Sequence, residues 1–267
     1  YESYSEDPAV VQSYGGKMVE GLQGVAGKDF LSEQHVIATA KHFLADGGTQ
    51  GGLDRGDAQM NEADLVKIHN AGYETALAAG AQTVMASFSS WQGVKMHGNK
   101  YLLTDQLKTQ MGFDGLVVGD WNGHAFVSGC TPVSCAQAIN AGLDIFMAPE
   151  GNWKELYHNT VAQVKSGEIP QARLDDAVAR ILRVKIRAGL FEKGAPSTRE
   201  LAGKREVIGS AEHRAVARQA VRESVVLLKN NAQTLPVKAS SKILVAGDSA
   251  DNIGKQSGGW SITWQGT

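Results

Sequence analysis

The sequence predicts an α/β fold in which parallel strands alternate with helices and form part of a β/α barrel. Three observations lead to this prediction. Short apolar runs recur along the chain, helical patterns separate them, and each run ends in polar or aromatic residues that a buried strand would not choose. The four runs are VIATA (36–40), TVMAS (83–87), LVVG (116–119) and DIFMA (144–148).

Helical periodicity fills the intervals between and after these runs. Apolar residues recur with the spacing of one helix face, and the predicted helices cover 62–80, 102–111, 134–142, 153–167 and 172–189. Continuous apolar strands that alternate with helices pair in parallel, either in a doubly wound sheet or in a barrel.

The ends of the predicted strands favour the barrel. The carboxyl ends of several barrel strands converge on one site, whereas an open sheet concentrates its ligand at one switch point. All four runs end in chemically distinctive residues, namely Lys41-His42, SFSSW (87–91), Asp120-Trp121 and Pro149-Glu150. Because only four of the usual eight strands are present, we expect the C-terminal part of a TIM-type (β/α)8 barrel.

The pattern changes near residue 193. We expect residues 1–192 to belong to the catalytic barrel and 193–212, which contain Gly, Pro and Ser, to form a linker. Residues 213–267 then begin a second α/β (sandwich) domain with a helix and a strand over 242–247. This second domain stops before it could enclose a core, so we expect the sequence to be incomplete at both ends.

Charge and composition exclude several classes of function. The chain carries 26 basic and 28 acidic side chains, a formal charge of −2, so nothing favours a nucleic-acid partner. No apolar run approaches the roughly 20 residues of a membrane span. The glycine-rich DGGTQGG (46–52) lacks the spacing and the Lys-Ser/Thr ending of a phosphate-binding loop.

Two cysteines, Cys130 and Cys135, are compatible with either a disulfide or two thiols. A disulfide would favour a periplasmic or extracellular protein, whose signal peptide would lie outside these residues. No second pair of ligands accompanies them at the spacing of a zinc site, and we expect neither a metal nor a cofactor.

Asp120 is unusual because it follows directly on an apolar strand, in GLVVGDWNGH. A single Asp in this position could cap a helix or pair with Lys41 or His42. Its neighbours add a different possibility, since Trp121 offers a flat face for a sugar ring, and Lys41 and His42 offer donors for hydroxyl groups. A carboxylate in these surroundings is what a glycosidase nucleophile requires.

A resemblance to a known family covers nearly the whole chain. The sequence resembles the β-glucosidase and exo-β-glucanase branch of glycoside hydrolase family 3 in several ordered stretches. They are YESYSEDP, TAKHFLADGGT, TVMASFSSWQGVKMHGN, LLTDQLKTQMGFDGLVVGDW, AINAGLDIFM, RLDDAVARILRVKIRAGLFE, SVVLLKN and KILVAGDSADNIGKQSGGWSITWQG.

The resemblance implies a role for particular residues. Asp120 would be the catalytic nucleophile, and Trp121 part of the aromatic wall beside the terminal sugar. Lys41 and His42 would bind hydroxyls of the terminal glucose, and Trp264 would hold the next sugar. Asp46, in the ADGGT loop, would shape the pocket.

Two positions depart from the plant exo-glucanases. Phe88, which the resemblance places among the substrate-binding residues, stands where they carry Tyr, and Phe126, six residues after Asp120, stands where they carry Arg. His97 lies in a predicted loop and would either line the pocket or cap the following helix. The acid/base Glu is expected beyond Thr267, so this stretch alone would be inactive.

The implied activity is that of a retaining, exo-acting β-glucosidase or β-glucan glucohydrolase. It would release β-D-glucose from the non-reducing ends of β-glucosides and β-gluco-oligosaccharides in two covalent steps. Alternatives are a β-xylosidase of related specificity and a degenerate sugar-binding fragment without turnover. The β-N-acetylhexosaminidase branch is disfavoured because KHFLADGG lacks the Pro and His of its KHFPGHG motif.

Overall fold

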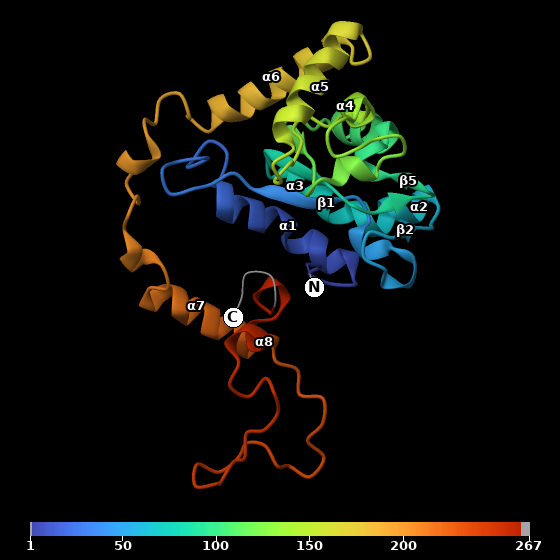
Figure 1. Ribbon diagram of the computed structural model, residues 1–267. Coiled ribbons are helices and arrows are strands. Elements are labelled where there is room, and N and C mark those ends of the chain that lie inside the picture. Colours follow the sequence, from blue (N-terminus) through green and yellow to red (C-terminus); the bar gives the residue numbers. More distant parts are fainter. Residues whose placement is uncertain (1, 263–267) are drawn as a thin grey trace. The chain divides into compact units, whose positions relative to one another are not determined.

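The structure is a computed structural model that describes residues 2–262. The chain divides into two compact units, one over residues 3–200 and one formed by the residues from 201 onward together with Glu2 (Figure 1). The boundary falls within the segment 193–212 that we expect to be a linker. Trp264 lies outside the described residues.

The first unit alternates strands with helices as the sequence predicts. Its α-helices are α1 (Pro8–Gln23), α2 (Glu62–Asp64), α3 (Ala71–Ala78), α4 (Ala136–Ala141), α5 (Trp153–Ser166) and α6 (Gln171–Arg187). Its strands are β1 (Thr39–Phe43), β2 (Asp57–Ala58), β3 (Thr83–Ala86), β4 (Ser90–Trp91), β5 (Val94–Lys95) and β6 (Leu116–Val118). The π-helical segments are η3 (Leu65–Asn70) and η5 (Tyr101–Gln110), and short 3₁₀ turns are η1 (Asp46–Gly48), η2 (Gln50–Gly52), η4 (Met96–Gly98), η6 (Gly123–Phe126) and η7 (Pro196–Thr198).

A parallel sheet of order β1-β3-β6 is the centre of this unit. In its register, Val84 of β3 lies between Ala40 of β1 and Val117 of β6. A parallel bridge from Val118 to Ile145 adds the fourth predicted run at the β6 edge. The predicted α/β fold with parallel strands is therefore confirmed, whereas closure into a barrel stays a prediction.

The first strand begins later than predicted. We expected it over 36–40, but β1 runs from Thr39 to Phe43, because its backbone pairs with β3 only from Thr39 onward. Lys41 and His42 consequently lie inside the strand rather than after it. The apolar pattern misplaced the strand because Val36, which it counted as buried, is 61% exposed.

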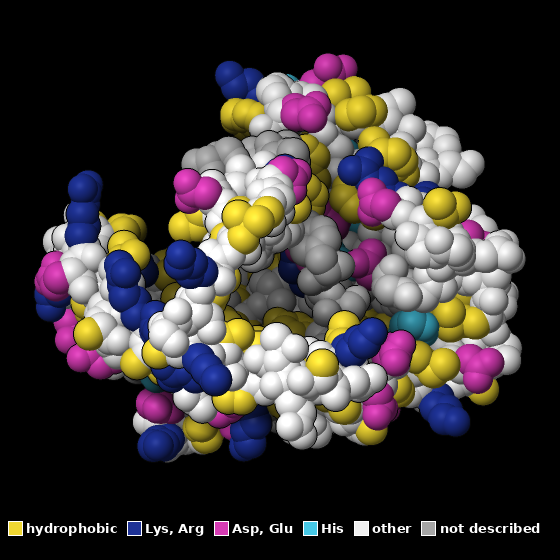
Figure 2. All heavy atoms as spheres, turned by 90° about the horizontal axis from the view of Figure 1, so that it is seen from below, with side chains coloured by type: hydrophobic (Ala, Val, Ile, Leu, Met, Phe, Trp, Pro, Cys, Tyr) yellow, Lys and Arg dark blue, Asp and Glu magenta, His cyan; other side chains and the backbone are white. Residues whose placement is uncertain are grey.

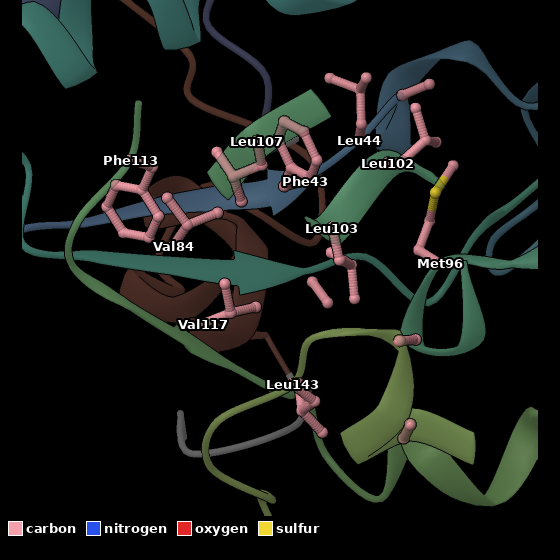
Figure 3. Packing of buried hydrophobic residues seen from close by; sticks show 14 of the residues in the cluster. Phe43, Leu44, Val84, Met96, Leu102, Leu103, Leu107, Phe113, Val117 and Leu143 are labelled. Carbon is pink, nitrogen blue, oxygen red and sulfur yellow. The ribbon is translucent and has the colours of Figure 1, made fainter. Parts of the chain in front are cut away.

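The core lies between the sheet and η5 (Figure 3). Phe43, Val84 and Val117, one from each strand, are at most 1% exposed and pack with Leu103 and Leu107 of η5. These leucines are four residues apart, so they lie on the same face of the helical segment. Burial of such side chains contributes roughly 1.5–3 kcal/mol each.

A buried ion network joins α6 to the sheet. Asp144 has no exposed side-chain surface and pairs with Lys108 of η5 at 2.8 Å and with Arg173 of α6. Its second oxygen accepts the N–H of Val117 at 2.8 Å. Burial lowers the pKa of the Lys108 ammonium to about 8, against the opposing effect of Asp144.

The second unit contains η8 (Arg205–Val207), α7 (Ala211–Ser224), α8 (Ile253–Ser257) and η9 (Gly259–Ser261). The strand predicted over 242–247 is wrong, since this segment is irregular. A strand needs a neighbouring strand to pair its N–H and C=O groups, and the described residues of this unit supply none. Leu244 of this segment remains 89% exposed.

Length and composition of the described helices, and the charges on one face, bear on the possible partners of the surface. Within residues 2–262, no helix combines the length and the apolar composition needed to cross a membrane. On the face shown in Figure 2, basic and acidic side chains are interspersed, in agreement with the net charge of −2.

The ion network leads to a first prediction. Replacing Asp144→Asn removes the fully buried carboxylate that Lys108 and Arg173 share and leaves Asp176, whose side chain is 42% exposed, as the carboxylate that both still contact. Breaking a buried pair costs about 3–5 kcal/mol. We expect the thermal unfolding midpoint of the full-length protein to fall by several degrees. Asp175→Asn, on the exposed side of α6, is the matched control and should change stability by less than about 0.5 kcal/mol. Equal midpoints for the two variants would contradict this role of Asp144.

Candidate active site

The site is built around the turn that follows β6. Two residues after Asp120, Asn122 adopts the left-handed conformation at φ 51°. The N–H of Gly123 then donates to the Asp120 carbonyl at 2.9 Å. One carboxylate oxygen of Asp120 accepts the Trp121 N–H at 2.7 Å. The turn therefore fixes the orientation of the Asp120 carboxylate through its own backbone.

His97 contacts this turn through a hydrogen bond to the backbone of Asp120. Its Nε2 accepts the backbone N–H of Asp120 at 2.9 Å, and its ring is 1% exposed. Burial lowers the pKa of His97 to about 4, and His124 acts in the same direction, although a hydrogen bond to the Ser87 carbonyl opposes the shift. The ring is thus neutral at ordinary pH, as an acceptor at Nε2 requires. His97 neither lines the pocket nor caps the next helix; it positions the backbone of Asp120.

Gly123 makes room for this imidazole. A Cβ on Gly123 would lie 2.2 Å from the His97 ring, closer than any real contact, and a Cβ on Gly119 would lie 3.4 Å from it. The glycine at 123, at the end of GDWNG, therefore follows from the close approach of a buried side chain, whereas a Cβ at 119 would make an ordinary contact.

His42 lies between two carboxylates. Its Nε2 is 3.6 Å from the second oxygen of Asp120, and its Nδ1 is 3.3 Å from Asp46. His42 is 9% exposed and Asp120 17%, so both side chains are largely withdrawn from water. The hydrogen bond from His42 holds the pKa of Asp46 below its usual value, and the nearby charge of Lys41 adds to this effect.

The end of β3 supplies two further polar groups. The Ser87 hydroxyl lies 3.2 Å from Asp46 Oδ1 and 2.8 Å from the Ser89 hydroxyl. Both serines are fully buried. Sequence reasoning marked the segment SFSSW as a strand end but assigned no role to Ser87; a hydroxyl directly after an apolar strand was the available signal.

Exposed aromatic side chains surround these buried groups. Trp121 and Phe126 are 44% and 47% exposed, and the Phe88 ring meets Phe126 edge to face at 5.6 Å between centroids. The structure therefore brings His42 of β1 to Asp120 after β6, and the Phe88 ring within 6.1 Å of the His97 ring. Lys41 and Trp121 are the chain neighbours of His42 and Asp120.

The loop after η6 is tied down by several bonds. A disulfide joins Cys130 to Cys135. The His124 ring lies 3.0 Å from the Pro132 carbonyl, which also accepts from Asn152 at 3.1 Å, and burial lowers the pKa of His124. The loop is thus fixed on both sides of Phe126.

A cavity of about 360 Å³ lies elsewhere, beside the amino ends of β3 and β6, with Gln82 and Phe113 among its lining residues. Parallel sheets carry their functional groups at the carboxyl ends of the strands, so we do not assign chemistry to this cavity.

The arrangement at the carboxyl ends can bind a hydroxyl-rich ring. Asp46, His42 and Ser87 offer acceptors and donors, and Trp121 offers an apolar face. Asp120 presents one oxygen that is not engaged by the Trp121 N–H and faces His42 instead.

Comparison with known proteins gives the family. Residues 1–184 match the family model described as the glycosyl hydrolase family 3 N-terminal domain. The chain belongs to glycosyl hydrolase family 3. Its relatives include the lysosomal beta glucosidase of Dictyostelium discoideum, 32% identical over all of this chain, and the periplasmic beta-glucosidase of Salmonella typhimurium, 34% identical over 97% of it. The chain spans 33% and 34% of these two relatives.

Solved structures agree with this family 3 assignment. The exo-1,3/1,4-beta-glucanase ExoP from a Pseudoalteromonas species is 58% identical, with a TM-score of 0.96 over all of this chain and 33% of that chain. The beta-glucosidase from Listeria innocua, in complex with isofagomine, is 33% identical, with a TM-score of 0.78 over 88% of this chain and 33% of that chain.

The contact between His97 and Asp120 predicts a specific mutational pattern. His97→Leu removes the acceptor for the Asp120 N–H and should lower kcat by at least about tenfold, whereas His97→Gln retains an acceptor near the same place and should be affected less. Steady-state kinetics of the full-length protein would measure this, with thermal midpoints recorded for both variants. Equal kcat values for Leu and Gln at similar stability would show that His97 only fills space.

The depressed pKa of His97 also predicts a pH dependence of stability. The unfolded histidine binds a proton near pH 6.5 and the folded one near pH 4, so between these values the unfolded state holds more protons. The stabilisation is complete above about pH 6.5 and is lost as the pH falls toward 4. We expect the melting temperature of the wild type to fall more steeply across this window than that of His97→Gln. Parallel curves would refute the neutral, buried state of the ring.

Proposed function

We propose that the full-length protein is a retaining, exo-acting β-glucosidase or β-glucan glucohydrolase that releases β-D-glucose from the non-reducing ends of β-gluco-oligosaccharides. The observation that carries this proposal is the Asp120 carboxylate at the end of β6, oriented by its own turn, facing His42 and adjoining Trp121. The names of the relatives support a β-glucoside as the substrate.

In the proposed first step, the Asp120 oxygen that faces His42 attacks the anomeric carbon of the terminal glucose. The bond from that carbon to the leaving oxygen breaks, and a Glu beyond Thr267 gives this oxygen a proton. Water then attacks the glycosyl ester, loses a proton to the same Glu and releases β-glucose with retained configuration. The two carboxyl groups of such a pair lie about 5–5.5 Å apart.

The other polar groups would bind the sugar ring. His42 is held by Asp46, so the pair can present an oriented donor or acceptor to a hydroxyl without rearrangement. Lys41 would bind a second hydroxyl of the same glucose. Trp264, which the resemblance assigns to the next sugar, remains part of the proposal on that ground alone.

The remaining expectations belong to the same proposal. The sheet β1-β3-β6 with its bridge at Ile145 would be the C-terminal part of a TIM-type barrel over 1–192, and 213–267 would begin a second α/β domain. A periplasmic or extracellular location is supported by the disulfide and by two relatives that are named periplasmic.

A β-xylosidase is the second candidate. Two relatives favour it, the beta-xylosidase of Formosa agariphila, 31% identical over 90% of this chain, and the periplasmic beta-glucosidase/beta-xylosidase of Dickeya chrysanthemi, 28% identical over 93%. A product profile of the full-length protein on laminaribiose, cellobiose and xylobiose separates the two, and inactivity on all three would favour a sugar-binding protein without turnover.

The role of Asp120 is tested by Asp120→Ala in the full-length protein. We expect kcat for an aryl β-glucoside to fall by several orders of magnitude, because the covalent step loses its nucleophile. Added azide should restore turnover and give an α-glycosyl azide. Asp105→Ala, an exposed carboxylate paired with Lys100, is the control and should leave kcat unchanged. An Asp120→Ala variant that kept more than about a tenth of the wild-type kcat, an effect below roughly 1.4 kcal/mol, would show that Asp120 is structural.

A further inference from the structure

Arg55, to which the proposed mechanism gives no part, lies over the Phe88 ring and near the Phe126 ring. The guanidinium carbon of Arg55 lies 4.5 Å from the centre of the Phe88 ring and 5.7 Å from that of Phe126. The two rings meet at 86°, so they form a corner in which a flat guanidinium fits. These three residues are called the Arg55 corner below.

The backbone of the Arg55 corner is fixed. The Lys95 ammonium donates to the carbonyls of Arg55 at 2.8 Å and of Phe88 at 3.0 Å, which joins the two loops. Arg55 itself adopts a left-handed conformation at φ 59°, and a Cβ on the following Gly56 would lie 2.8 Å from the Leu53 carbonyl. A conformation that is costly for a non-glycine residue is therefore held in place by its neighbours.

The guanidinium keeps donors available for a ligand. Stacking uses its faces and leaves the N–H groups in the plane of the group. Nε pairs with Asp54 at 3.4 Å, and among residues 2–262 no acceptor is recorded for the two terminal nitrogens. The side chain is 51% exposed, so these donors meet solvent.

The Arg55 corner is next to the site but farther out. The Phe88 ring lies 6.1 Å from the His97 ring, which in turn holds the Asp120 backbone. Phe126 ends the 3₁₀ turn η6 that begins three residues after Asp120. Because the side chains of His42 and Asp120 are 9% and 17% exposed while those of Arg55 and Phe126 are about half exposed, the terminal sugar would occupy the inner position and the following sugar the rim.

We propose that Arg55 is a specificity-determining residue that donates hydrogen bonds to hydroxyl groups of the sugar on the leaving-group side of the scissile bond. Phe88 and Phe126 hold its guanidinium in the binding orientation. The inference rests on the proposed hydrolysis of β-glucosides.

The test compares two substrates of the full-length protein. Laminaribiose places a sugar on the leaving-group side, whereas β-glucosyl fluoride carries only fluoride there. We expect Arg55→Met to lower kcat/KM for laminaribiose about tenfold to a hundredfold, as loss of charged hydrogen bonds does, and to change the value for the fluoride less than about twofold. Arg55→Lys keeps the charge but not the fork of donors and should fall between.

Two controls complete the design. Phe126→Leu should also lower the ratio of kcat/KM for laminaribiose to kcat/KM for β-glucosyl fluoride, because the guanidinium loses a ring that orients it. Thermal unfolding midpoints would show that each variant is folded. Arg183→Met is the matched control, because the Arg183 guanidinium donates to the backbone carbonyl of Asp114. This variant should leave the ratio unchanged. Equal losses on both substrates, or none on laminaribiose, would overturn the inference while leaving the proposed activity intact. A wild-type protein inactive on both substrates would refute the proposed function and this inference together.

Discussion

Parallel backbone pairing of β1, β3 and β6 is the constraint on which the site depends. The register places Ala40, Val84 and Val117 side by side, so the three strands end at the same edge of the sheet. His42, Ser87 and Asp120 come from these three ends although they are far apart in the sequence. A shift of one strand by one residue would turn its side chains to the opposite face and separate these groups.

The site also depends on a layer beneath it that touches no ligand. His97 reaches the Asp120 backbone only because Gly123 carries no side chain, and it accepts a hydrogen bond only because burial keeps it neutral. A sheet alone would bring Asp120 to the right edge; the imidazole and the tight turn determine which way its carboxylate points. Precision of this kind is what positions a reacting group.

Two aspartates near strand ends illustrate how surroundings assign a role. Asp144 has no exposed surface, and Lys108 and Arg173 neutralise it, so it serves the fold. Asp120 retains some exposure, faces a histidine rather than a lysine or arginine, and adjoins half-exposed aromatic rings. Both follow or precede similar apolar runs, and only the three-dimensional contacts distinguish a structural carboxylate from one available for chemistry.

By itself the sequence determined the alternation of strands and helices and the polar residues at the strand ends, among them His42 and Asp120, since apolar periodicity and polar strand ends are local features. It placed β1 three residues too early and predicted a strand over 242–247, because whether an apolar run becomes a strand depends on a partner that periodicity does not reveal. Only the tertiary structure showed that His97 accepts the Asp120 N–H and that Arg55 lies over the Phe88 ring. Each of these contacts joins residues that are distant in the chain, and such contacts leave no spacing that a single sequence can show.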